Sequence, residues 1–413
     1  MICIIREMIF SIMNKEYTYK FRIYPNEKQE ILLSKHFGSI RYVYNLFLDK
    51  RTKFYLNAKE KHLAKKTLNY NEMSGELTKI KQQPETEWLS ECNAKSLQHS
   101  LKHLETAFNR FFKKKSKYPR FKSKKNKQSF RIPQFVSIKN NRLYFPKFKE
   151  GIKIDHHREI DGNIENATII RNKAGQYYAC IGTTRNIKPK IKTDNVVGID
   201  LGIKSLVVCS DGQTFPNIKT TKKYEKLLRI RQQDLSRTKK GSRGRDKARL
   251  SVGKIQVKIA NIRHNHLHQI TSKLINENQV ICMEDLSVKN MMSNHCLSKS
   301  IGDCSWGELM RQITYKAGWY GRKIIKIDRY FPSSKTCSHC GYINEGLTLD
   351  QREWECPRCQ KVLDRDYNAS LNILRQGYNL TVGTTGLAVC PDVRPISNNG
   401  LLVGTETSAL RQG

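Results

Sequence analysis

The feature that most restricts the fold of this 413-residue chain is a set of four cysteines near its C-terminus. Cys337, Cys340, Cys356 and Cys359 have the spacing C-x2-C-x15-C-x2-C. Each C-x2-C pair closes a tight knuckle that presents two sulfurs, so the four thiolates predict one tetrahedral zinc ion with Zn–S distances of about 2.3 Å. Two disulfides or four unrelated thiols are the alternatives. Because four protein ligands fill the zinc shell and leave no place for water, we expect this site to be structural.

The charge of the chain predicts a polyanionic partner. Lys and Arg number 75 against 37 Asp and Glu, which gives a formal net charge of +38. Nucleic acid is the usual partner of such a surplus, because each Lys or Arg can displace a condensed counterion from phosphate. A solubilising surface would be served better by mixed signs. An anionic membrane is a weaker alternative, since no segment reaches the roughly 20 apolar residues that span a bilayer.

Composition and length place the chain among intracellular globular proteins. Hydrophobic residues make up 38% of it, enough to bury a core, and 413 residues allow two to four domains. Eight of the 12 cysteines are scattered singly, as reduced thiols usually are. We therefore predict a cytoplasmic protein.

The spacing of apolar residues changes twice along the N-terminal half of the chain. EYTYKFRIYPN alternates apolar and polar residues and stops at Pro25, which predicts a strand. Apolar residues then recur at three- and four-residue spacing from Glu27 to about Phe112, which predicts a helical domain. From Ser129 to about Arg185 the segments are short and β-like, with a turn at Lys139-Asn140-Asn141. We predict a small β-barrel-like domain into which the helical block is inserted.

A basic run links these two patterns. Residues 113–128 contain nine Lys or Arg and no acid, with Tyr118 and Phe121 among them. Such a run is often only a solvated face, but interleaved aromatic rings favour nucleic acid because rings stack on bases. The basic helix at 243–258 is the alternative binding surface. The residues that we predict to contact nucleic acid are Lys113, Lys114, Lys115, Lys117 and Arg120.

Three acidic positions follow or open buried elements. The apolar run VVGI ends in Asp200, the run VICM ends in Glu284 and Asp285, and Asp364 and Asp366 open an apparent helix. Taken singly, each is as well explained by a turn or a helix cap. Together they supply the oxygen ligands that hard Mg²⁺ prefers, as in phosphodiesterases that use two ions about 3.5–4 Å apart.

Several motifs closely resemble the transposon-encoded TnpB family, RNA-guided nucleases related to the type V CRISPR effectors. They are GIDLGIKSL, MEDLSVKNMM, SWGELMRQITYKAGWYGRKIIKIDRYFPSSKTCSHCG and DRDYNAS, and YKFRIYPN and GLAVCPDVR extend the likeness over nearly the whole chain. The resemblance implies an α+β multidomain chain, in which a four-cysteine zinc ribbon is inserted into a RuvC-like nuclease domain of ribonuclease-H fold.

The resemblance also implies the catalytic residues. The acid-bearing segments map onto Asp200, Glu284 and Asp366, which would bind two Mg²⁺ ions beside the one structural zinc. Asp366 is preferred to Asp364 because the third motif of the family reads Asp-x-Asn, as in Asp366-Tyr367-Asn368. The expected partners are a guide RNA from the same element and double-stranded target DNA, with no membrane contact. We expect a monomer or weak dimer in a bacterial or archaeal cytoplasm, associated with the nucleoid.

The implied activity is RNA-guided DNA cleavage beside a short motif that the protein reads. A nuclease-silent RNA-guided repressor is one alternative, against which the intact acids argue. An accessory DNA-binding protein of transposition is another, and strand joining would need a nucleophile or an acid triad of its own. The expected domains are an N-terminal extension at 1–12, a wedge-like β domain at 13–26 and 126–192, a helical recognition domain at 27–125, the nuclease domain at 193–336 and 361–376, the zinc ribbon at 337–360, and a flexible tail at 377–413.

Overall fold

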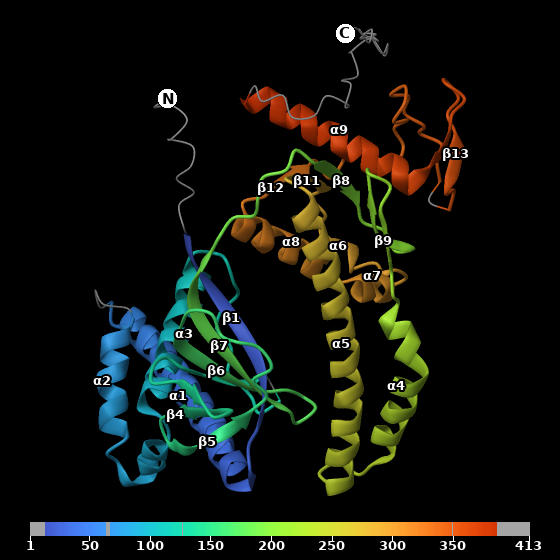
Figure 1. The fold of residues 1–413 in the computed structure, drawn as a ribbon. Helices are drawn as coiled ribbons and strands as arrows, with labels where there is room; N and C mark the ends of the chain where they lie inside the picture. Colours follow the sequence, from blue (N-terminus) through green and yellow to red (C-terminus); the bar gives the residue numbers. More distant parts are fainter. Residues whose placement is uncertain (1–12, 63–66, 126, 349, 386–413) are drawn as a thin grey trace. The chain divides into compact units, whose positions relative to one another are not determined.

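The computed structural model describes residues 13–62, 67–125, 127–348 and 350–385, so the expected N-terminal extension lies outside it. The chain forms two compact units, whose elements are labelled in Figure 1. Of the described residues, the N-terminal unit comprises residues 13–186 and 234–254. The C-terminal unit comprises residues 187–233 and the described residues from 255 to 385. Among the described residues, no helix is both long and apolar enough to cross a membrane.

The N-terminal unit contains a seven-stranded sheet with the order β2-β6-β7-β1-β5-β4-β3. The strand predicted near residues 16–24 is confirmed as β1, which lies at the centre of this sheet. The predicted turn is confirmed between β3 and β4, where Asn140 and Asn141 both have positive φ. Within the described residues the ladder runs from β2 to β3 without closing into a barrel. The strands are β1 (Met13–Tyr24), β2 (Gln128–Ile132), β3 (Ser137–Lys139), β4 (Arg142–Phe145), β5 (Phe148–Ile154), β6 (Asn163–Arg171) and β7 (Tyr177–Ile187).

The helices predicted between residues 27 and 112 are confirmed and pack on this sheet. Asn26 begins the first of them, because its side-chain oxygen accepts a 2.8 Å hydrogen bond from the amide of Gln29. Phe21 from the sheet and Leu33 and Leu101 from the helices belong to one buried core. The helices are α1 (Glu27–Glu60), α2 (Tyr70–Ile80), a 3₁₀ helix (Pro84–Glu91) and α3 (Ala94–Phe112).

The C-terminal unit contains a five-stranded mixed sheet with the order β10-β9-β8-β11-β12. Strands β8, β11 and β12 are parallel, whereas β9 is antiparallel to both β8 and β10. The parallel strands are joined by helical crossovers, as parallel pairing requires. The strands are β8 (Val196–Asp200), β9 (Ser205–Cys209), β10 (Thr214–Pro216), β11 (Val280–Glu284) and β12 (Lys323–Ile327).

Helices cover both faces of this sheet. Val197 and Ile281 pack with α5 and α8 on one face, whereas Val196 and Val280 pack with α9 on the other. This alternation along buried strands produces three layers (Figure 1). The helices are α4 (Thr220–Arg237) and α5 (Arg243–Glu277), each shared with the N-terminal unit, then α6 (Val288–Met291), α7 (Ser298–Cys304), α8 (Trp306–Tyr320) and α9 (Arg365–Thr385).

The predicted flexible tail from residue 377 is wrong for its first residues, because α9 continues to Thr385. The helix is held there by close packing, since a Cβ on Gly377 would collide with the sulfur of Cys282 on β11. The remainder of the predicted tail, residues 386–413, lies outside the described residues.

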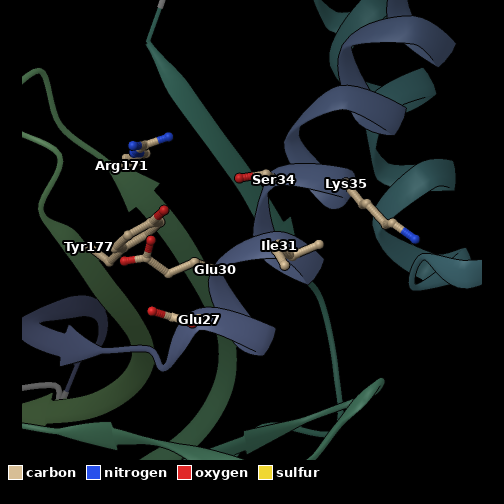
Figure 2. Close-up of a pocket in the computed structure, with 7 residues that line it drawn as sticks. All are labelled: Glu27, Glu30, Ile31, Ser34, Lys35, Arg171 and Tyr177. Atoms are coloured by element: carbon tan, nitrogen blue, oxygen red, sulfur yellow. The ribbon is translucent and has the colours of Figure 1, made fainter. Parts of the chain in front are cut away.

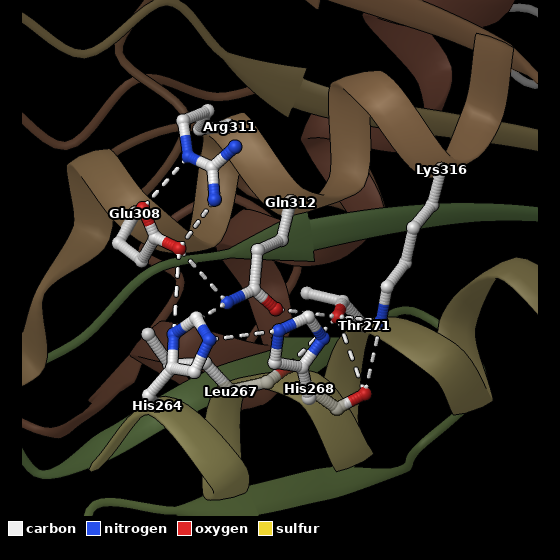
Figure 3. A network of polar contacts seen from close by, with 8 residues as sticks. All are labelled: His264, Leu267, His268, Thr271, Glu308, Arg311, Gln312 and Lys316. Atoms are coloured by element: carbon white, nitrogen blue, oxygen red, sulfur yellow. Dashed lines mark hydrogen bonds and ion pairs between the residues drawn. The ribbon is translucent and has the colours of Figure 1, made fainter. Parts of the chain in front are cut away.

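A polar network joins α5 to α8, which cover one face of the sheet (Figure 3). Lys316 donates a 2.7 Å hydrogen bond to Thr271, Thr271 donates to Gln312, and Gln312 donates to Glu308. Burial lowers the pKa of Lys316 to about 8. These hydrogen bonds satisfy buried polar groups and fix α8, which leads directly into β12.

Candidate functional site

The four predicted zinc ligands form one cluster. Their sulfur atoms all lie within 4.8 Å of one another, and none is in a disulfide. Sγ of Cys337 is 3.7 Å from Sγ of Cys359, and Sγ of Cys340 is 3.5 Å from Sγ of Cys356. A tetrahedral zinc with Zn–S bonds of about 2.3 Å separates its sulfurs by about 3.8 Å, so the cluster fits this ion.

The two cysteine pairs have the same backbone geometry. The amide of Cys337 donates to Tyr342, and the amide of Cys356 donates to Lys361, in each case five residues later. The residue four positions after each of these cysteines, Gly341 or Gln360, has a positive φ that closes the turn. The cluster is therefore built from two equivalent knuckles.

The module that holds these knuckles extends beyond the predicted end at residue 360. Strand β13 (Glu353–Glu355) pairs with β14 (Val362–Asp364), and Trp354 and Leu347 are buried in one cluster with the cysteines. The nuclease segment predicted to resume at residue 361 thus begins with a strand of the ribbon, because β13 needs this partner.

The three predicted catalytic acids meet at one edge of the C-terminal sheet. Asp200 ends β8 and Glu284 ends β11, and the parallel register that pairs Met283 with Ile199 brings these acids side by side. Asp366 lies in the first turn of α9. A Cβ placed on Gly202, two residues after Asp200, would lie 3.9 Å from Oδ2 of Asp366.

Burial raises the pKa of two of these acids, and the neighbouring negative charges raise that of Asp200 further. Burial and, after it, the charges of Glu284 and Asp366 raise the pKa of Asp200 to about 7. Burial also raises the pKa of Glu284, against the effect of a 2.7 Å hydrogen bond from the Ser333 hydroxyl. Carboxylates that repel one another in a half-buried site favour a bound cation.

The neighbouring acids have other partners. Asp285 accepts hydrogen bonds from Lys326 at 2.9 Å and Arg329 at 2.7 Å, which lower the pKa of its carboxyl. Asp364 caps α9, because its side chain accepts a 2.8 Å hydrogen bond from the amide of Tyr367. Both arrangements favour Glu284 and Asp366 as the members of the acidic site.

Sequence analysis missed two side chains that touch the acids. Ser333 follows β12 and its hydroxyl donates to Glu284, while Arg352 from the four-cysteine module lies 3.3 Å from both oxygens of Asp366. A serine and an arginine carry no spacing signal of their own. Only their nearness in sequence to the cysteine knuckles could have indicated them.

The acids form a looser group than the cysteines. Within the described part of the chain, only the four cysteines bring their ligand atoms within 4.8 Å of one another. The donor set of the acids is nevertheless all oxygen, which suits Mg²⁺ rather than zinc.

The basic run that begins at Lys113 is exposed but anchored at two points. The Tyr118 hydroxyl lies 2.8 Å from that of Thr52, and its ring packs edge-on against Phe108 and Phe111. The amide and carbonyl of Lys122 both bond the side chain of Asn45. The predicted nucleic-acid-binding residues Lys113, Lys114, Lys115, Lys117 and Arg120 are all exposed, and their role in binding stays a prediction.

A separate pocket lies in the N-terminal unit, between α1 and the strands β6 and β7 (Figure 2). None of the predicted site residues lines it. Its lining residues are Glu27, Glu30, Ile31, Ser34, Lys35, Arg171 and Tyr177.

Known proteins match this chain along most of its length. It is 39% identical to a Streptomyces pristinaespiralis protein named "Putative RNA-guided DNA endonuclease", covering 87% of this chain and 89% of that protein. It is 30% identical to InsQ of Escherichia coli (strain K12), which bears the same designation, covering 89% and 93%. Family models described as "Probable transposase", of the IS605 type, and "Cas12f1-like, TNB domain" match residues 179–295 and 306–373. The chain belongs to the TnpB family.

A further model of this family is described as a helix-turn-helix domain and matches residues 13–60. The structure has one strand and one continuous helix there, β1 and α1, so the description does not fit the fold of this TnpB protein. Its fold is similar to that of a solved Cas12f1 complex with guide RNA and target DNA, with a TM-score of 0.52 at 15% identity over 87% of this chain and 98% of that one.

Proposed function

We propose that this TnpB protein is an RNA-guided DNA endonuclease encoded by an insertion sequence, which cuts DNA by metal-dependent phosphodiester hydrolysis. The observation that carries the proposal is the meeting of Asp200, Glu284 and Asp366 at one sheet edge, with the pKa of Asp200 raised to about 7. The names of its full-length relatives support the same activity.

The acids are the proposed ligands of two Mg²⁺ ions, which when bound would supply an activated water and charge stabilisation at the leaving oxygen. Asp200 supplies a carboxylate whose proton must leave before an ion binds. Ser333 holds one oxygen of Glu284, and Arg352 places a cation beside Asp366. That arginine is suitably placed to bind a phosphate of the substrate strand.

The nuclease fold that we propose is the RuvC-like variant of the ribonuclease-H fold. The five-stranded sheet supports that assignment by its strand order β10-β9-β8-β11-β12 and by its antiparallel strand β9. Helices on both faces of this sheet support it as well. The finer division of the N-terminal unit into a wedge-like β domain and a helical recognition domain belongs to the same proposal. These parts would hold the guide RNA and its duplex with target DNA, with sequence read by base pairing. We propose a monomer or weak dimer.

The test is cleavage by protein purified with its guide RNA. Asp200→Ala, Glu284→Ala and Asp366→Ala should each abolish Mg²⁺- or Mn²⁺-dependent cutting while RNA and target binding persist, because each removes an oxygen ligand and leaves the basic surfaces intact. Asp364→Ala is the matched control, and it should cost helix stability but not cutting. If Asp366→Ala still cuts DNA and Asp364→Ala does not, the assignment of Asp366 as the third metal ligand is wrong.

The zinc assignment has its own measurement. Purified protein should contain about one zinc per chain, bound by four thiolates. Cys356→Ser should lower the zinc content and destabilise the C-terminal unit. Iron, or linked cysteines without metal, would contradict the assignment.

A further inference from the structure

Two buried asparagines of α9 bind the segment between β12 and the zinc ribbon. Asn368 and Asn372 lie one turn apart and are almost wholly buried, at 0% and 2% exposure. The Asn372 amide donates to the carbonyl oxygens of Ser333 at 2.8 Å and Thr336 at 2.6 Å. Asn368 donates to Thr336 at 2.8 Å and accepts from the Ser338 amide at 2.8 Å.

The segment that they hold carries two functional groups at once. Ser333, at its start, donates its hydroxyl to Glu284. Cys337, at its end, belongs to the four-cysteine cluster proposed to bind zinc, and Ser338 lies inside the first knuckle. Asn368 is itself two residues from Asp366 on α9. One pair of amides therefore connects the zinc knuckle to two of the three acids.

The geometry of these hydrogen bonds is specific. Each amide group has its orientation fixed by two or more partners, and all the backbone partners lie in residues 333–338. An apolar side chain would fill the same space without desolvating an amide, which costs free energy unless every hydrogen bond is made. Packing alone therefore does not explain why both positions are asparagine. Both amides are explained if residues 333–338 must be held in one position.

We propose that Asn368 and Asn372 are positioning residues that couple the zinc ribbon to the catalytic carboxylates. The inference rests on the proposed nuclease function. When zinc orders the first knuckle, the two amides fix residues 333–338, and Ser333 then holds Glu284 in place to bind metal. Hydrogen bonds that orient a metal ligand typically change metal affinity by about 10–100-fold. The zinc is thus part of the active site's support, although it takes no part in the chemistry.

The test is Mn²⁺ binding to the zinc-loaded full chain, followed by electron paramagnetic resonance without nucleic acid. Ser333→Ala removes only the hydroxyl on Glu284, and Asn372→Ala removes the amide that holds Ser333. Each should weaken Mn²⁺ binding by about tenfold or more with zinc still at one per chain. Ser370→Ala is the matched control, because this buried hydroxyl lies on the same helix between the two asparagines and donates to the Tyr367 carbonyl, away from residues 333–338.

Two further readouts separate positioning from stability. With guide and target present, kcat should fall in Ser333→Ala while target affinity is unchanged, and its melting temperature should match that of Ser370→Ala. Equal Mn²⁺ affinity in Ser333→Ala, Asn372→Ala and Ser370→Ala would overturn the inference while the proposed function stands. If Asp200→Asn binds Mn²⁺ as the wild-type protein does, the acids hold no metal, and both the inference and the proposed function would be overturned.

Discussion

At the scale of the residue, Asp200 shows the conflict between stability and function most clearly. Its folded pKa of about 7 lies above its ordinary value of 3.8, so the folded state binds more protons than the unfolded state between these values. Stability therefore falls as pH rises through this window, in the absence of a bound cation. The rest of the fold offsets this cost.

Asp200→Asn should accordingly stabilise the Mg²⁺-free protein at pH 8, by on the order of a few kcal/mol, and should stabilise it much less at pH 4–5. Thermal unfolding at both pH values, in buffer without a chelator so that zinc stays bound, measures the difference. Asp211→Asn is the control, since Asp211 is an exposed carboxylate near β9. A variant that is equally stabilised at both pH values would show that Asp200 is not the titrating group.

Two aromatic residues of the basic run differ in their surroundings. Tyr118 packs against α3, whereas Phe121 remains 60% exposed beside the anchored Lys122. Phe121→Ala should weaken binding of single-stranded nucleic acid by about 1–3 kcal/mol per stacked base and leave the melting temperature unchanged. Tyr118→Ala should lower the melting temperature. Phe135→Ala, at another exposed ring of the N-terminal unit, is the control for removal of an aromatic side chain. A lowered melting temperature in Phe121→Ala would indicate packing instead of stacking.

At the scale of the element, α9 is the part that completes the site. It brings Asp366 to the sheet edge because its backbone lies directly on β8. A Cβ on Gly198 would collide with the Ser370 carbonyl and lie 2.6 Å from the Leu374 amide, and neither backbone group can move alone.

Gly198→Ala should therefore destabilise the C-terminal unit by about 1–3 kcal/mol or more, and should lower cleavage by displacing Asp366. Denaturant unfolding and a cleavage assay on the same preparation measure both effects. Gly318→Ala is the matched control, because a Cβ at this exposed position of α8 meets nothing within 4 Å, and a gain of up to about 1 kcal/mol is expected. Equal stability of the two variants would mean that α9 does not lie this close to β8.

The elements themselves were largely predictable from the sequence, and their long-range contacts were not. Alternation predicted β1, helical spacing predicted α1 to α3, and the cysteine spacing predicted the knuckles. The site acids could be placed at the ends of β8 and β11, because an apolar run that stops at a carboxylate has a simple physical meaning. Arg352 belongs to no periodic pattern. Asn368 and Asn372 have helical spacing, but the sequence does not identify their partners, since these depend on which segments α9 brings together. The extent of α9 itself was hidden by a Gly- and Thr-rich composition.

At the scale of the whole molecule, the net charge of +38 dominates. Such a surplus destabilises the nucleic-acid-free fold by self-repulsion, and the same cations are neutralised when nucleic acid binds. The run at Lys113, Lys114, Lys115 and Lys117 is one exposed part of this surplus.

Changing these four lysines to Gln should weaken binding of all guide and target sequences alike. The slope of log affinity against log salt should fall by roughly 0.7–0.9 for each phosphate that the variant no longer neutralises. Filter binding across a salt series measures the slope, with an equal number of Gln changes at Lys222, Lys223, Lys226 and Arg229 of α4 for comparison. An unchanged slope in the first variant would assign the binding surface elsewhere, with the basic helix at 243–258 as the next candidate.

The charge also predicts opposite salt responses for the free and the RNA-loaded protein. In free protein, added NaCl screens like charges, so the melting temperature should rise between about 0.1 and 0.5 M salt. In RNA-loaded protein, the same salt weakens the binding of phosphates and removes the stabilisation that bound RNA gives the fold, so the melting temperature should fall. Scanning fluorimetry before and after ribonuclease treatment of one preparation measures both slopes. In the four-Gln variant the melting temperature should change less with salt in each state, because this variant carries fewer cations to screen or to pair. A melting temperature that changes with salt in the same direction in both states would mean that the surplus charge is not what binds RNA.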